Sequence, residues 1–227
     1  MQAQPSERTD RTFYQQSLAH TIRGYEQTVG VNSPLYKGKE YVDYTFRIQG
    51  DQYFQSYIWE KGSVYYDGLL YSDVSMKYDI ANEVLIVDHA HLPFQVALES
   101  ANIDYFSLLD HHFIRLEADT LTHAGISTGF YDLLYDGKTR FLVKRAKILK
   151  DAIEDRQLHY WFEATDRYFI QKDDVFHRVK SKRSVLKVFY DHKKDIQRFM
   201  KRNKIKFRKQ PEEAIHRIVM YYDQQVH

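Results

Sequence analysis

The chain has 227 residues, with 43% hydrophobic and 28% charged residues, and its formal net charge is only +2. It has no cysteine, which excludes disulfides, thiolate nucleophiles and zinc–thiolate sites. No run of about twenty apolar residues is present, so the sequence predicts no transmembrane helix. Nineteen Tyr and fourteen Phe beside nine Gly and four Pro favour a β-rich body.

The small net charge conceals two oppositely charged parts. Residues 177–227 contain fifteen Lys/Arg and five Asp/Glu, a net charge of +10, whereas the preceding residues carry −8. Such an asymmetry indicates electrostatic partners and does not specify a fold. Helical spacing of apolar residues predicts a helix over residues 8–28, and residues 1–7 are expected to be a disordered mature N-terminus. Met1 is either a native cytosolic start or an expression start that replaces a removed signal peptide.

The apolar period changes to two between residues 35 and 176, which predicts an antiparallel β body. Asp and Gly tolerate the positive φ angles of tight hairpin turns. The expected elements are strands Tyr41–Ile48, Tyr53–Trp59 and Phe113–Leu116, hairpin turns at Asp67-Gly68, Ala81-Asn82 and Asp136-Gly137, and a final pair formed by His159–Glu163 and Arg167–Gln171.

The last segment, 177–227, is expected to be a basic helical hairpin that packs on the body or extends from it. Ser181 or Ser184 is a suitable cap for a first helix that runs to about Lys201, and Pro211 begins a second helix. The fold class is therefore α+β: a mostly antiparallel β meander, as a curved sheet, open barrel or sandwich, with an N-terminal helix and a C-terminal helical hairpin.

Several segments in a fixed order resemble a known group of proteins. They are the stretches 61–68, 76–80, 131–138, 184–189, 191–196, 203–207 and 221–223. Over about residues 60 to 225 the chain resembles uncharacterised secreted or periplasmic proteins of Bacteroidetes-type bacteria. The resemblance implies an exported envelope protein with a β-rich body and a C-terminal helical pair. It brings no known active site.

The best metal candidates are His89 and His91, because residues i and i+2 of a strand project together. No third ligand and no familiar zinc spacing accompany them, so solvated strand-end histidines explain them more simply. His111 and His112 are adjacent and face opposite ways on a strand, although Asp110 is placed to orient one of them for acid–base chemistry. No nucleophile elbow and no phosphate-binding loop is present, so no catalytic residue and no cofactor is predicted.

The basic connector is the remaining candidate binding segment. Its cations are Lys201, Arg202, Lys204, Lys206, Arg208 and Lys209, and Ile205 and Phe207 alternate with them as inward-facing residues. We expect a non-enzymatic envelope binding or scaffold module whose partner is an envelope protein, an acidic surface component or its own acidic body. A histidine-dependent or metal-dependent hydrolase is the first alternative. Nucleic-acid binding through the tail, with Phe207 stacking on a base, is the second.

Overall fold

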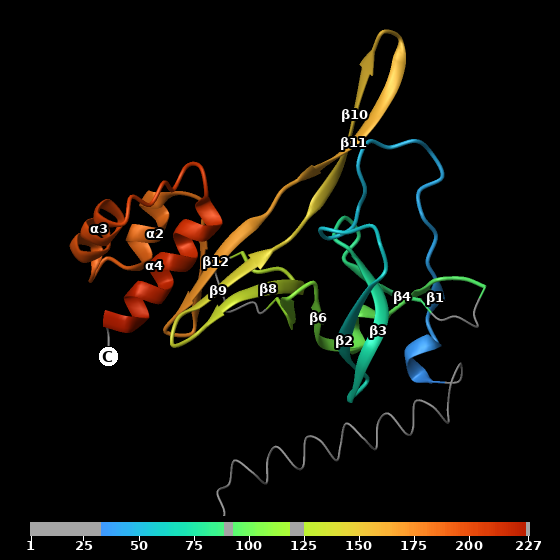
Figure 1. Cartoon of the computed structure of the whole chain (residues 1–227), viewed down its shortest axis with the longest axis horizontal. Coiled ribbons are helices and arrows are strands. Elements are labelled where there is room, and N and C mark those ends of the chain that lie inside the picture. Colours follow the sequence, from blue (N-terminus) through green and yellow to red (C-terminus); the bar gives the residue numbers. More distant parts are fainter. Residues whose placement is uncertain (1–32, 89–92, 119–124, 226–227) are drawn as a thin grey trace, which may run out of the picture.

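One large antiparallel sheet forms the body of the protein in this computed structural model, which describes residues 33–88, 93–118 and 125–225 (Figure 1). The sheet has eleven strands in the order β1-β5-β4-β3-β2-β6-β7-β8-β9-β12-β13 and does not close, because β1 and β13 are its two edges. The predicted antiparallel β-rich fold with a helical C-terminal segment is confirmed at this level. The predictions for residues 1–7 and 8–28 lie outside the described residues.

The strands vary from two to eleven residues in length. Their bounds are β1 Lys39–Glu40, β2 Glu60–Tyr66, β3 Leu69–Asp79, β4 Val84–Val87, β5 Val96–Ala97, β6 Ile103–Leu108, β7 His111–Leu116, β8 Gly129–Asp136, β9 Arg140–Lys144, β10 Lys147–Glu154, β11 Gln157–Ala164, β12 Arg167–Lys172 and β13 Val175–Val179. Two single-turn 3-10 helices, Pro34–Tyr36 and Ser100–Asn102, complete this part of the chain.

Tight turns with positive φ angles connect the hairpins. Asp67 and Gly68 join β2 to β3 with φ angles of 52° and 78°, as their sequence predicts. Asp173 and Asp174 join β12 to β13 in the same way, with φ angles of 51° and 60°. The turn at Asp136-Gly137 is longer than predicted, because Asp136 pairs directly with Arg140 and the intervening residues stay outside the ladder.

Both faces of the sheet are covered in its C-terminal half. In the other half, one large hydrophobic cluster, which includes Val64, Phe106 and Phe113, packs on strands β2–β8. A second cluster joins Phe141, Val143 and Ile170 to the C-terminal helices, and a smaller one around Tyr131, Leu142 and Phe169 covers the opposite face. Strand β9 is consequently buried at four successive positions.

The hairpin β10–β11 leaves the sheet between β9 and β12 and extends away from it (Figure 1). The predicted pairing of His159–Glu163 with Arg167–Gln171 is wrong. Strand β11 pairs with β10, while β12 pairs with β9 and β13. Lys144 and Arg167 form the last pair of the β9–β12 ladder. The residues between them form the hairpin, so β9 and β12 stay paired while the hairpin projects from the sheet.

The predicted strands Tyr41–Ile48 and Tyr53–Trp59 are wrong, since this segment is irregular apart from two isolated bridges. Its aromatic side chains pack on the projecting hairpin: the ring centroids of Tyr44 and Phe162 lie 5.6 Å apart. Its polar side chains bind the sheet, because the Tyr41 hydroxyl donates a 2.7 Å hydrogen bond to Asp79 Oδ2. Side-chain contacts therefore replace a backbone ladder here.

Three helices follow the sheet: α2 Lys182–Val188, α3 Lys193–Arg202 and α4 Pro211–Gln225. The expected single helix up to Lys201 is divided, because α2 ends at Val188 and the buried Phe189 turns the chain toward α3. Ser181 caps α2 with its hydroxyl, and Pro211 begins α4 as predicted. Residues 177–179 belong to β13, so the sheet extends three residues beyond its predicted end. Within the described part of the chain, no helix is both long and apolar enough to cross a bilayer.

Candidate functional site

The predicted basic connector meets the segment before α2 in a groove with an apolar floor. Lys206, Arg208 and Lys209 line this groove together with three cations from the β13–α2 junction, Lys180, Lys182 and Arg183, and no Asp or Glu lines it. Its floor is formed by Met200, Ile205, Phe207 and Pro211. Ile205 and Phe207 are held there because they pack against the second core cluster, so the alternating cations face outward.

The other predicted connector cations lie beside this groove. Lys204 lines a smaller neighbouring depression that also contains Lys206, Glu213 and Arg217. Lys201 and Arg202 are exposed at the C-terminal end of α3, where cations complement the negative helix end. The structure thus gathers half of the predicted cations into the groove, and adds cations that the sequence analysis had not selected.

A continuous basic surface results from these placements. We use this name for Lys180, Lys182, Arg183, Lys187, Lys193, Lys206, Arg208 and Lys209, which line adjoining grooves over α2 and the connector. All eight side chains are exposed, and none forms an ion pair with any residue that the structure describes. Within the described residues, these eight cations therefore form a positively charged surface without ion-pair partners of its own.

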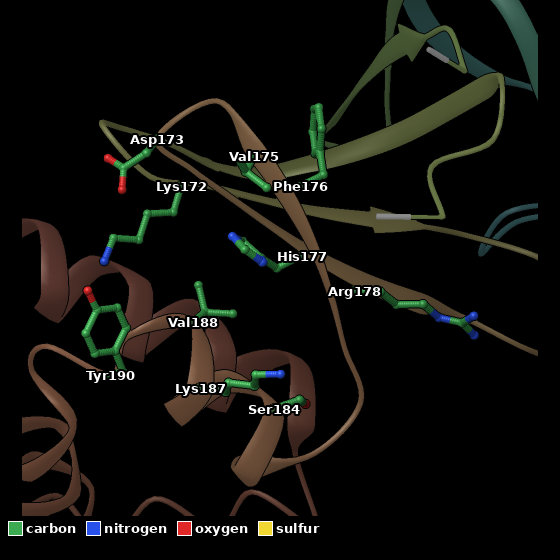
Figure 2. Close-up of a pocket in the computed structure, with 10 residues that line it drawn as sticks. All are labelled: Lys172, Asp173, Val175, Phe176, His177, Arg178, Ser184, Lys187, Val188 and Tyr190. Carbon is green, nitrogen blue, oxygen red and sulfur yellow. The ribbon is translucent and has the colours of Figure 1, made fainter. Parts of the chain in front are cut away.

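A second groove lies between the edge strand β13 and α2 (Figure 2). Lys187, Val188 and Tyr190 line its helical side, and His177 projects from β13 toward them. Burial lowers the pKa of His177, and the nearby cations Lys172 and Lys187 lower it further. The ring is therefore predominantly neutral at neutral pH.

One end of this groove is fixed by an ion pair. Lys172 Nζ lies 3.1 Å from Asp191 Oδ2, which also accepts a 3.0 Å hydrogen bond from the Tyr222 hydroxyl. Burial opposes the charged carboxylate, but the hydrogen bonds from Lys172 and Tyr222 outweigh it and lower the pKa of Asp191. The ammonium group of Lys172 also lies 4.8 Å from the Tyr222 ring centroid. These contacts hold β12 against α4.

We expect Asp191→Asn to remove part of the stability that is lost in acid. Because the folded-state pKa is below the ordinary value of 3.8, ionised Asp191 contributes stability that is complete above that value. The contribution disappears as the pH falls through the lowered pKa, so the window lies below about pH 4. Urea unfolding curves recorded between neutral pH and this range measure it. An unchanged acid slope in Asp191→Asn contradicts the assignment.

The histidines do not converge in the described structure. His89 and His91 lie outside the described residues. His111 and His112 face opposite sides of β7, as predicted: His111 contacts the Phe54 ring, and His112 Nδ1 lies 3.0 Å from Ser107 Oγ. Over residues 33–88, 93–118 and 125–225, no group of three His, Asp or Glu side chains is placed to hold a metal ion.

Asp132, and not Asp110, orients His111. His111 Nδ1 donates a 2.8 Å hydrogen bond to Asp132 Oδ2, and its Nε2 lies 3.1 Å from Gln55 Nε2. A carboxylate only accepts hydrogen bonds, so Nε2 is the nitrogen that accepts from the Gln55 amide. Asp110 instead occupies the β6–β7 turn with a φ angle of 61°. Both ring nitrogens of His111 are thus engaged in internal hydrogen bonds.

Asp132 belongs to a buried charge cluster that the sequence analysis missed. Arg145, only 7% exposed, binds Asp132 at 2.6 Å, Asp166 at 2.8 Å and Glu212 at 2.6 Å. These carboxylates come from β8, from the base of the projecting hairpin and from the first turn of α4. Burial opposes the Arg145 charge, but the hydrogen bonds and the three carboxylates raise its pKa above the ordinary value. Arg145 therefore ties sheet, hairpin and helix together.

Comparisons with known proteins give no relative to set beside this geometry. Protein-family models, curated proteins and solved structures all yielded no match.

Proposed function

We propose that the protein is a non-enzymatic binding module whose basic surface binds an acidic segment of a partner protein. The observation that carries this proposal is the set of eight exposed Lys and Arg side chains without an ion-pair partner in the described structure. Cations concentrated on one face raise the local concentration of an acidic partner and increase its association rate.

The grooves favour a polypeptide over a nucleic acid or a lipid headgroup. Apolar side chains form the floor between the cations, among them Ile205 and Phe207 in one groove and Val188 in the other. A peptide supplies both carboxylates for the rim and apolar side chains for the floor, whereas a phosphate backbone supplies charge alone. Phe207 packs on the second core cluster, which opposes its use as a stacking platform for a base.

We further propose that the module acts in the cell envelope, as the resemblance described above implies. The acidic partner is then an envelope protein or an acidic component of the cell surface. The alternative of a histidine-dependent hydrolase has weaker support, because His111 uses both ring nitrogens in contacts with Asp132 and Gln55.

Reversing three charges of the basic surface is expected to weaken binding of fluorescent poly-L-glutamate by at least about tenfold at low salt. The variant is Lys182→Glu/Arg183→Glu/Lys206→Glu, which changes exposed side chains only. Fluorescence anisotropy measures the affinity. Raising the ionic strength from about 50 to 500 mM is expected to weaken the wild-type complex, because exposed charges are screened beyond the Debye length.

The matched control is Lys138→Glu/Lys150→Glu/Arg156→Glu, which changes the net charge equally but leaves the basic surface intact. It is expected to keep most of the affinity. Equal losses in both variants contradict the proposed surface. Single-stranded DNA of matched charge, or vesicles of anionic phospholipid, that bind more tightly than poly-L-glutamate contradict the choice of an acidic protein partner.

A further inference from the structure

Among the residues that the structure describes, no strand pairs with the outer edge of β13. This strand ends the eleven-stranded sheet, and its ladder with β12 contains no bulge and no proline. An unpaired edge of this kind presents a row of N–H and C=O groups to any extended segment that approaches it. The opposite edge, β1, has only two residues and offers a much shorter template.

The register of β13 identifies which backbone groups face outward. Lys172 and Val175 flank the two-residue turn, so the Val175 N–H bonds to the Lys172 carbonyl across it. Because bonding directions alternate along an antiparallel pair, His177 also points its backbone groups toward β12. The N–H and C=O groups of Phe176 and Arg178 therefore lie on the free side.

A strand added at this edge lies beside the groove between β13 and α2. Figure 2 shows His177 directed toward α2 and Phe176 directed to the other side of the strand. The groove has a volume of about 730 Å³, which falls in the range of about 300–1,000 Å³ for ligand-binding clefts. Val175 and Tyr190, at 52% and 77% exposure, leave apolar surface uncovered along it.

The charge of the groove identifies the chemistry of the added strand. Lys172, His177 and Lys187 lie on the α2 side, Arg178 lies on the other, and Asp173 is the only carboxylate among the lining residues. A second copy of this chain brings the same cations against each other, so a symmetric β13–β13 pairing is electrostatically unfavourable. An acidic segment is attracted to the same positions.

We infer that the protein binds an extended acidic peptide as an additional antiparallel strand on β13, with its acidic side chains facing α2. This inference rests on the proposed function and specifies the form of the acidic partner. A residue opposite His177 points its side chain toward Lys187 and Tyr190. Residues opposite Phe176 and Arg178 exchange backbone hydrogen bonds with β13 and place their side chains on the other face.

The test uses a fluorescent, end-blocked peptide of alternating glutamate and valine, with the whole 227-residue chain. In the inferred pairing the valine N–H groups face β13 and the glutamate N–H groups face solvent. N-methylation of the valines is expected to weaken binding by about tenfold or more, since it removes the hydrogen bonds that the valine N–H groups donate to β13. N-methylation of the glutamates is expected to leave the affinity nearly unchanged. The two N-methylated peptides carry the same charge, so electrostatic attraction alone produces no difference between their affinities.

A protein variant gives an independent test of the same hydrogen bonds. Arg178→Pro removes an outward N–H and is tolerable on an edge strand, because this N–H does not bond to β12. Arg178→Ala is the control, since it removes the same charge and retains the N–H. Arg178→Pro is expected to bind the peptide about two- to tenfold more weakly than Arg178→Ala, because it lacks one hydrogen bond to the peptide. The NMR titration of the His177 ring is also expected to report a raised pKa in the complex, because a bound glutamate offsets Lys172 and Lys187.

The outcomes separate this inference from the proposed function. Binding of poly-L-glutamate together with equal affinities for both N-methylated peptides overturns the strand addition but leaves the acidic-partner proposal standing. If the protein is a dimer and the alternating peptide dissociates it, the outer edge of β13 binds a second copy of the chain. This outcome also overturns the inference. Absence of binding by poly-L-glutamate and by the alternating peptide overturns the proposed function itself.

Discussion

Replacing Arg145 by alanine is expected to destabilise the protein by about 3–5 kcal/mol, because it leaves buried carboxylates without their cation. Asp132 is completely buried, and its Oδ1 already lacks a hydrogen-bond partner in the described structure. Loss of Arg145 removes the 2.6 Å contact to Asp132 Oδ2 and leaves only the His111 bond to that carboxylate. Urea unfolding followed by tryptophan fluorescence measures the change.

A second ion pair of the same sheet supplies the control for Arg145→Ala. Arg140 binds Asp136 at 2.7 Å, and both side chains are about half exposed. Exposed pairs of this kind contribute about 0.2–1 kcal/mol, so Arg140→Ala is expected to have a small effect. A comparable destabilisation in Arg140→Ala and Arg145→Ala contradicts the structural role given to the buried cluster. Retention of wild-type stability by Arg145→Ala contradicts it as well.

The sequence predicted the parts of the fold that local chemistry determines. Asp67-Gly68 marked a hairpin because both residues tolerate positive φ. Ser181 marked a helix start because its hydroxyl accepts a hydrogen bond from the first turn, and Pro211 because its missing N–H has no helical partner there. The turn Asp155-Arg156 has positive φ angles of 49° and 63° but contains no glycine, so it gave no comparable signal. The hairpin that it closes was therefore assigned to the wrong partner strand.

Strand order and the irregular segment required long-range information. Strand β2 pairs with β6 as well as with its hairpin partner β3, and nothing in the sequence of either strand specifies this choice. Residues 41–48 alternate like a strand, yet their aromatic residues pack on the side chains of β11. Alternation shows that one face of a segment is buried, but it does not show that a neighbouring backbone is present.

The candidate site was predictable in charge but not in shape. The cations of the connector were visible as a cluster, because they alternate with Ile205 and Phe207. Their convergence with Lys182 and Arg183 depends on how α2, α3 and α4 pack together in the second core cluster, which brings two separate segments to one groove. The cluster around Arg145 had no sequence signal, because its four charged residues come from separate segments.

The shape of the groove between β13 and α2 depends on the packing of one buried aromatic residue, which separates α2 from α3. Phe189 is completely buried, and its ring centroid lies 4.4 Å from that of Tyr222 on α4. Replacing Phe189 by alanine is expected to destabilise the protein by about 3–5 kcal/mol, because it removes a large buried ring and leaves a cavity. Urea unfolding followed by circular dichroism measures this loss.

The next residue along the chain, which also follows α2, provides the control. Tyr190 is 77% exposed, so Tyr190→Ala is expected to change stability by no more than about 0.5 kcal/mol. Because Tyr190 lines the β13 groove, this variant is expected to weaken peptide binding while it retains the fold. Equal unfolding midpoints for Phe189→Ala and Tyr190→Ala contradict the assignment of Phe189 to the core. If Phe189→Ala folds but loses affinity for the peptide, the second core cluster determines the geometry of the groove.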